Sequence, residues 1–244
     1  MKELRLAAVQ RCYEQEAQRA QQESLSYERY LLSLAQLECQ QRRQNRVERL
    51  LRESKLPLEK TLESFERSRL PRKVQQQFNS LLEGTFVDRR ENGLLFGNPG
   101  SGKTHLAAAL GQELIHQGRR VYFVPCSLLV QDLLIAKRDL RLSRVLKKMS
   151  RYEVLIVDDL GYVEQNREEM EVLFTLLAER YERGSVIITS NLPFSQWERI
   201  FKDPMTTAAA IDRLVHHSVI VELNLSSYRM EAAKKKKQGA NKGN

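Results

Sequence analysis

Residues 97–104 read GNPGSGKT, which fits the phosphate-loop pattern G-x-x-x-x-G-K-[ST]. An apolar run at 93–96 precedes this segment and a helix-forming run at 106–110 follows it, so the loop is expected to join a strand to a helix. Glycines let backbone N–H groups turn towards an anion, and the start of the helix adds its positive dipole end. We therefore expect ATP phosphates to be bound by Gly97, Asn98, Pro99, Gly100, Ser101, Gly102, Lys103, Thr104 and His105.

Within this loop, two side chains have separate expected roles. Lys103 supplies a mobile positive charge for the β and γ phosphates, and Thr104 supplies a hydroxyl group for Mg²⁺. A nucleotide bound in this way also needs carboxylates beside the loop, because Mg²⁺ prefers oxygen ligands.

A second apolar run, at 154–157, ends in Asp158 and Asp159. Four apolar residues in a row are typical of a central parallel strand that is buried on both faces. Ligands of open α/β sheets bind at the carboxyl ends of the strands. We expect Asp158 to hold Mg²⁺ through water and Asp159 to orient or deprotonate the attacking water. The apolar strand predicted at 185–190 likewise leads into Asn191, which is a candidate contact for the γ-phosphate or the water.

The order of these motifs resembles that of the AAA+ ATPases of the DnaC and IstB group, and most of all IstB-type helper ATPases of bacterial insertion sequences. After the two strands come Asp-Arg-Leu at 212–214 and Ser-Tyr-Arg at 227–229. Gly-Lys-Thr-His-Leu-Ala at 102–107 and the Ser-Tyr-Arg ending are the most particular points of likeness. The resemblance covers about residues 55–230. It implies that Asp158 and Asp159 form the Walker B pair, Asn191 is sensor 1, Arg213 is a finger for a neighbouring subunit's nucleotide and Arg229 is sensor 2.

Two features depart from the family pattern. Many members carry glutamate as the second Walker B acid, whereas Asp159 is one methylene shorter, so slow hydrolysis is expected. Only about twenty residues follow the last predicted strand, so the helical lid is reduced and Arg229 would act from a rudimentary lid.

Strand and helix patterns alternate through the rest of the chain, which predicts an α/β fold with a parallel sheet and helices on both faces. Strands are expected at 94–97, 120–125, 154–158, 185–190 and 217–223, and helices at 103–117, at 167–183 and within 127–150 and 194–215. The resemblance implies a P-loop AAA+ ATPase fold whose five-stranded sheet has the order 5-1-4-3-2. A small all-α domain is expected before it, from the residue spacing described below. The predicted domains are a helical DNA- or partner-binding domain at 1–56, the ATPase domain with its linker at 57–228 and a basic tail, expected to be disordered, at 229–244.

Helical spacing of apolar residues from Tyr27 to Leu51 predicts that the N-terminal part is helical. Arginines between and opposite these residues form a basic stripe, which we expect to contact DNA; its members are Arg42, Arg43, Arg46, Arg49 and Arg52. The alternative is a solvated surface balanced by neighbouring glutamates. In the connector that follows, Phe65 is a candidate contact for the nucleotide base, and an ordinary core phenylalanine is an equal alternative.

The formal net charge of +9 lies outside the nucleotide-binding part, because residues 91–228 are close to neutral. Phosphate neutralisation by Lys and Arg provides most non-specific affinity for nucleic acid, so this distribution favours DNA as a partner. Membrane binding would need bulky apolar anchors beside the basic residues, and Lys234–Lys237 have none. With no apolar run of membrane length and no signal-peptide pattern, the protein is expected to be cytoplasmic.

The expected function is an ATP-dependent, DNA-binding regulator of transposition. It would form a homo-oligomer through its ATP interfaces on duplex DNA and recruit or activate a transposase, and ATP hydrolysis would drive disassembly. The alternative in the same group is a DnaC-like helicase loader acting on single-stranded DNA and a replicative helicase. Proteins that bind single strands usually stack the bases on exposed aromatic side chains. Residues 38–55 contain no aromatic residue, which favours contact with the backbone of duplex DNA. A small-molecule kinase and a scaffold that binds ATP without hydrolysing it are two further classes.

Overall fold

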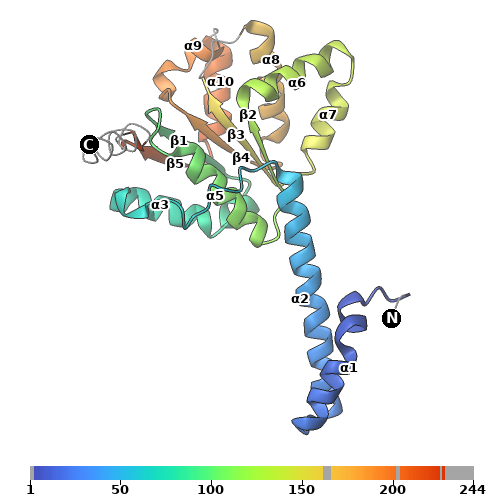
Figure 1. Ribbon diagram of the computed structural model, residues 1–244. Helices are drawn as coiled ribbons and strands as arrows, with labels where there is room; N and C mark the ends of the chain where they lie inside the picture. Colours follow the sequence, from blue (N-terminus) through green and yellow to red (C-terminus); the bar gives the residue numbers. More distant parts are fainter. Residues whose placement is uncertain (1–2, 162–165, 202–203, 226, 229–244) are drawn as a thin grey trace, which may run out of the picture. The chain divides into compact units, whose positions relative to one another are not determined.

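The computed structural model describes residues 3–161, 166–201, 204–225 and 227–228 (Figure 1). The chain separates into two compact units, residues 1–50 and 51–244, with the division inside helix α2. The predicted boundaries at 56/57 and 228/229 remain predictions, and the basic tail lies outside the described residues.

The N-terminal unit contains helix α1 (Ala7–Gln22) and most of helix α2 (Tyr27–Ser54), so the predicted helical character is confirmed. The helices run in opposite directions, as contacts at two levels show. The Tyr30 hydroxyl, near the start of α2, donates to the carbonyl oxygen of Tyr13 at 3.1 Å. At the other end, Glu38 Oε2 accepts hydrogen bonds from the backbone N–H groups of Ala8 at 2.8 Å and Val9 at 3.2 Å. Because α1 has no cap of its own, this carboxylate from α2 completes its first turn.

Five parallel strands form the sheet of the second unit, in the order β2-β3-β4-β1-β5. Read from the other edge, this is the predicted order 5-1-4-3-2, which is therefore confirmed. The strands are β1 (Asn92–Gly97), β2 (Val121–Pro125), β3 (Val154–Leu160), β4 (Ser185–Ser190) and β5 (Ser218–Leu223). The three inner strands are almost wholly buried, which explains their continuous apolar runs.

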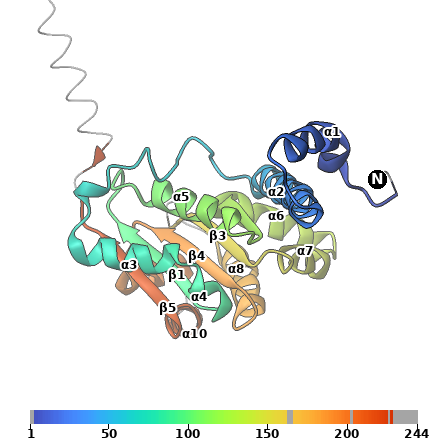
Figure 2. The ribbon, with the colours of Figure 1, turned by 90° about the horizontal axis from the view of Figure 1, so that it is seen from below.

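Helices cover both faces of this sheet (Figure 2). On one face, α5 (Lys103–His116) contacts strands β1 to β4, and α3 (Arg72–Leu82) contacts α5 and β5. On the other, α6 (Cys126–Arg138), α8 (Arg167–Arg180) and α10 (Pro204–Val215) surround one apolar core with residues of the strands.

Shorter elements complete the described chain: the 3₁₀ turns η1 (Arg67–Arg69) and η2 (Phe194–Gln196), and helices α4 (Thr85–Asp88), α7 (Leu142–Met149) and α9 (Glu198–Phe201). Local sequence sets the start of α8. Asn166 and Glu169 form a reciprocal capping box that starts α8. In the part of the chain that the structure describes, no helix is long and apolar enough to cross a membrane.

Candidate nucleotide-binding site

The phosphate-loop segment joins β1 directly to α5. Gly100 and Gly102 have φ angles of +80° and +99°, which L side chains rarely adopt. A Cβ atom at Gly102 would lie 2.8 Å from Phe65 Cε2, and one at Gly100 would collide with the Ser227 hydroxyl. Both positions therefore need glycine for backbone conformation and for space.

Lys103 begins α5, and its ammonium group folds back over the loop. Its Nζ donates to the carbonyl oxygens of Gly97 at 2.7 Å and Asn98 at 3.1 Å. These bonds hold the positive charge of Lys103 beside the loop. A phosphate group that binds there can replace the two carbonyl oxygens as the acceptor of the ammonium group's hydrogen bonds.

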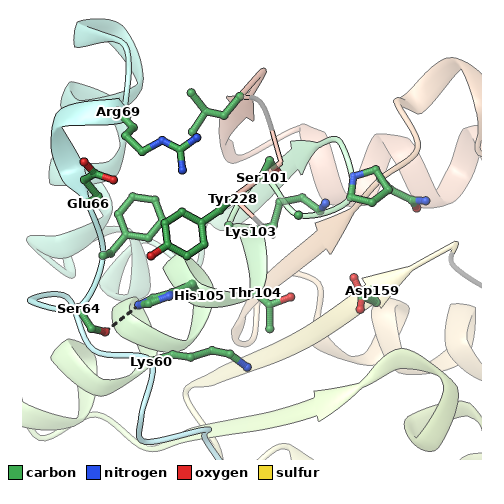
Figure 3. Close-up of a pocket in the computed structure, with 16 residues that line it drawn as sticks. Lys60, Ser64, Glu66, Arg69, Ser101, Lys103, Thr104, His105, Asp159 and Tyr228 are labelled. Atoms are coloured by element: carbon green, nitrogen blue, oxygen red, sulfur yellow. Dashed lines mark hydrogen bonds between the residues drawn. The ribbon is translucent and has the colours of Figure 1, made fainter. Parts of the chain in front are cut away.

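A pocket opens beside this loop (Figure 3). Its wall brings together five separate parts of the chain: the loop with the start of α5, the connector before α3, the end of β3, the residue after β4, and the segment after β5. The lining residues are Lys60, Ser64, Phe65, Glu66, Arg69, Pro99 to His105, Asp159, Asn191, Leu225 and Tyr228.

The connector is held over the pocket by hydrogen bonds to α5. His105 Nε2 lies 2.8 Å from the carbonyl oxygen of Thr61 and 3.1 Å from the Ser64 hydroxyl oxygen. The Phe65 ring meets the His105 ring edge-on, with 5.2 Å between centroids. Two turns further along α5, Gln112 Nε2 donates to the carbonyl oxygen of Lys60 at 2.9 Å. Phe65 was a candidate from the sequence, whereas the remaining connector residues carry no motif that could have identified them.

At the end of β3, the two aspartates have different surroundings. Asp158 is 6% exposed and accepts a hydrogen bond of 2.6 Å from the Thr189 hydroxyl, whereas Asp159 is exposed at the pocket. Burial raises the pKa of Asp158, and the charge of Asp159 adds to this, while hydrogen bonds from Thr189 and Thr104 act in the opposite direction.

Thr104 and Asp158 fit a magnesium ion. A hydroxyl and a carboxylate are hard oxygen donors. A bound cation would also favour the ionised form of the buried Asp158 carboxylate, which burial disfavours. These two residues therefore remain the proposed metal ligands.

Asn191 directly follows β4 and lines the same pocket. Its Oδ1 atom is buried and has no hydrogen-bond partner among the described residues. An unpaired buried acceptor is costly, and a bound water molecule can supply the donor. The structure thus brings Asn191 and Asp159 to the same pocket.

Arg213 lies elsewhere, on α10. Its guanidinium carbon is 4.6 Å from the centre of the Phe174 ring, and its Nη1 atom is buried with no hydrogen-bond partner in the described part of the chain. Arg213 borders a different, small cavity that is also lined by Arg180 and His217. The other predicted arginine, Arg229, lies outside the described residues.

The arginines of α2 differ in their surroundings although all five are exposed. Spacings of four and three place Arg42, Arg46 and Arg49 near one face, whereas Arg43 is rotated by about 100° from Arg42. Arg42 also has a structural role, since its Nε donates to Glu38 at 2.9 Å and its Nη2 to the carbonyl oxygen of Arg5 at 2.8 Å.

A second basic surface lies on α7. It was not identified from the sequence, because the charges of residues 91–228 sum to nearly zero. Between 137 and 151 the sequence has seven Lys or Arg residues against Asp139 alone. Arg144, Lys147 and Lys148 are exposed at helical spacing, while the apolar residues of α7 face the core. This periodicity is the signal that could have identified the surface.

Comparisons with known proteins agree with this fold and pocket. The family model for IstB-like ATP-binding proteins matches residues 1–238. An insertion sequence ATP-binding protein of Sinorhizobium fredii is 43% identical over 239 residues, which cover 98% of this chain and 80% of the relative. The ATP-binding protein of insertion sequence IS21 from Pseudomonas aeruginosa is 41% identical over 221 residues, covering 89% and 82%.

Solved structures show the same fold at lower identity. The DnaC helicase loader has a TM-score of 0.53 at 20% identity, covering 62% of this chain and 89% of that one. DnaA bound to AMPPCP and single-stranded DNA has a TM-score of 0.58 at 20% identity, covering 77% and 57%. The predicted AAA+ P-loop fold is thus confirmed. From its sequence and its fold, this protein belongs to the family of IstB-like ATP-binding proteins.

Proposed function

We propose that this protein is an ATP-hydrolysing regulator of transposition. It oligomerises with ATP on duplex DNA, recruits or activates the transposase of an insertion sequence, and disassembles when ATP is hydrolysed. The observation that carries this proposal is the division of the site: Lys103, Asp159 and Asn191 share one pocket, and Arg213 borders another. Such a site is complete when a second copy of the chain supplies the arginine.

The pocket residues have clear roles in this reaction. The loop N–H groups and Lys103 hold the β and γ phosphates, and Thr104 and Asp158 hold Mg²⁺, which when bound neutralises phosphate charge. Asp159 and Asn191 accept hydrogen bonds from a water molecule, which attacks the γ-phosphorus. The bond from that phosphorus to the bridging oxygen then breaks, and ADP and inorganic phosphate leave.

Arg213 is suited to act on a neighbour's nucleotide. A guanidinium group stays charged and can donate to two phosphate oxygens in parallel. Here it is held on the Phe174 ring and has one buried nitrogen without an acceptor in the described residues. If the side chain turns outwards, a neighbour's γ-phosphate would supply an acceptor for it, and ADP would not. ATP therefore stabilises the interface between subunits, and hydrolysis weakens it.

Duplex DNA is the proposed partner because the basic surfaces of α2 and α7 are suited to phosphate contacts. Neither the 38–55 segment nor α7 contains an aromatic residue on which single-stranded bases could stack. The names of the relatives, which place them in insertion sequences, support a transposase as the protein partner.

Mixing two inactive variants tests the divided site. Lys103→Ala removes ATP binding but keeps Arg213, and Arg213→Ala keeps the phosphate loop, so a mixture should recover phosphate release at interfaces that combine both intact parts. Arg183→Ala is a matched control, because Arg183 is an exposed arginine paired with Glu179, and it should hydrolyse ATP normally. Mixed oligomers that form but stay inactive would rule out the assignment of Arg213.

Titrating labelled duplex and single-stranded DNA in the presence of ATP or ADP tests the partner. Tighter binding of duplex with ATP than with ADP is expected. A preference for single strands under both conditions would replace the transposition proposal with the helicase-loader alternative.

A further inference from the structure

The two aspartates of β3 lie in an irregular stretch of the sheet. Val157 pairs with Ile188 and Leu160 with Ser190, so Asp158 and Asp159 both lie opposite Thr189 on β4. An arrangement in which two residues of one strand lie opposite a single residue of the next is a β-bulge. Bulges change the direction of side chains and are common beside functional sites. In a regular strand these neighbouring side chains would point to opposite faces of the sheet.

Asp159 carries the backbone strain of this bulge. Its φ angle is +60°, in the left-handed region that few residues other than glycine adopt. Aspartate tolerates this conformation better than most residues. Neighbouring groups must nevertheless stabilise this φ angle of Asp159, because strained backbone conformations persist only where their surroundings fix them.

Thr189 supplies that fixation with a single hydroxyl group. Its Oγ1 donates to Asp158 Oδ1 at 2.6 Å and accepts from the backbone N–H of Asp159 at 2.8 Å. The residue is fully buried, so water does not compete for these bonds. One hydroxyl therefore fixes the side chain of the first aspartate and the backbone of the second.

We propose that Thr189 is a positioning residue for ATP hydrolysis, which orients Asp158 and Asp159 together without contacting the nucleotide. Thr189 is not among the residues that line the pocket. Its loss should affect the step that uses the two acids, while the loop that binds the phosphates stays intact. This inference rests on the proposed hydrolysis of ATP at the site.

Thr189→Val is the sharpest test, because valine keeps the shape and loses both hydrogen bonds. We expect kcat to fall by about 10- to 100-fold, the range typical of residues that orient site ligands. The affinity for a fluorescent ATP analogue, measured without Mg²⁺, should match that of the wild-type protein. Thr189→Ser keeps the hydroxyl and should retain turnover. Thr175→Val is the matched control, since the Thr175 hydroxyl donates to the carbonyl oxygen of Glu171 within α8 and Thr175 is not among the residues that line the pocket.

Hydrogen exchange in the nucleotide-free wild-type protein provides a second measurement. The Asp159 amide should exchange slowly although its residue is exposed, and the protection should disappear in Thr189→Val. An unprotected Asp159 amide, or an unchanged kcat in Thr189→Val, would overturn the inference. A loss of analogue binding and of thermal stability in both the Val and Ser variants would also overturn it. If the wild-type protein does not hydrolyse ATP, the proposed function fails, and the exchange measurement alone decides whether Thr189 fixes the bulge.

Discussion

Replacing Arg46, Arg49 and Arg52 with alanine should weaken duplex binding and flatten its dependence on salt. Each lost phosphate contact lowers the slope of log affinity against log salt by about 0.9, so three contacts lower it by about 2.7. Between 50 and 200 mM salt this change corresponds to roughly a 40-fold difference in affinity. Arg42 is left unchanged, because it pairs with Glu38, the residue that caps α1, and donates to the Arg5 carbonyl oxygen before α1.

The assay is a titration of labelled duplex with protein and a non-hydrolysable ATP analogue at several salt concentrations. A variant with Arg144, Lys147 and Lys148 changed to alanine removes the same charge from α7 and is the matched comparison. A slope that falls only in the α7 variant would move the DNA contact to that helix. Unchanged slopes in both variants would refute the reasoning that these surfaces neutralise DNA phosphates.

Three further predictions concern the second unit, residues 51–244. Because its pKa is raised in the folded state, the ionised Asp158 carboxylate destabilises the metal-free protein above that pKa, and the cost disappears as pH falls below the unfolded value. Asp158→Asn should therefore raise the melting temperature without Mg²⁺ at pH 7, and the gain should shrink on acidification; a constant gain would contradict this. Asp159→Asn should bind ATP but release no phosphate, and full turnover would assign water positioning to another residue. Arg180→Met should lower the free energy of unfolding by on the order of 4 kcal/mol in urea, because Arg180 donates to the backbone carbonyls of Met149, Tyr152, Glu153 and Ser185.

The fold was predictable because its signals are local. A phosphate loop between a strand and a helix, and apolar runs of strand length, each define one element without reference to the rest of the chain. The family resemblance then supplied the order of the strands, which no local pattern contains. Expected strand and helix ranges differ from the observed ones mainly at their ends, as for β3, which continues through both aspartates to Leu160.

The sequence did not reveal residues whose positions depend on the pairing register of the strands or on segments without regular secondary structure. Thr189 contacts Asp158 and Asp159 only because the bulge leaves two residues opposite one, and a sequence read strand by strand does not reveal this pairing. Ser64 and Arg69 reach the pocket from a connector whose path is set by hydrogen bonds to α5. The α7 surface was missed for a simpler reason, since summing charges over a long range cancels a local cluster.

The carboxylate of Glu38 that caps α1 has a consequence for the order of folding during synthesis. A sixteen-residue helix without a side-chain cap at its N-terminus is marginal in water, so α1 is not expected to be stable before α2 has been made. Its N–H groups at Ala8 and Val9 gain their acceptor only when residue 38 becomes available. The first turn of α1 is therefore completed by α2, and the two helices should become ordered in one step.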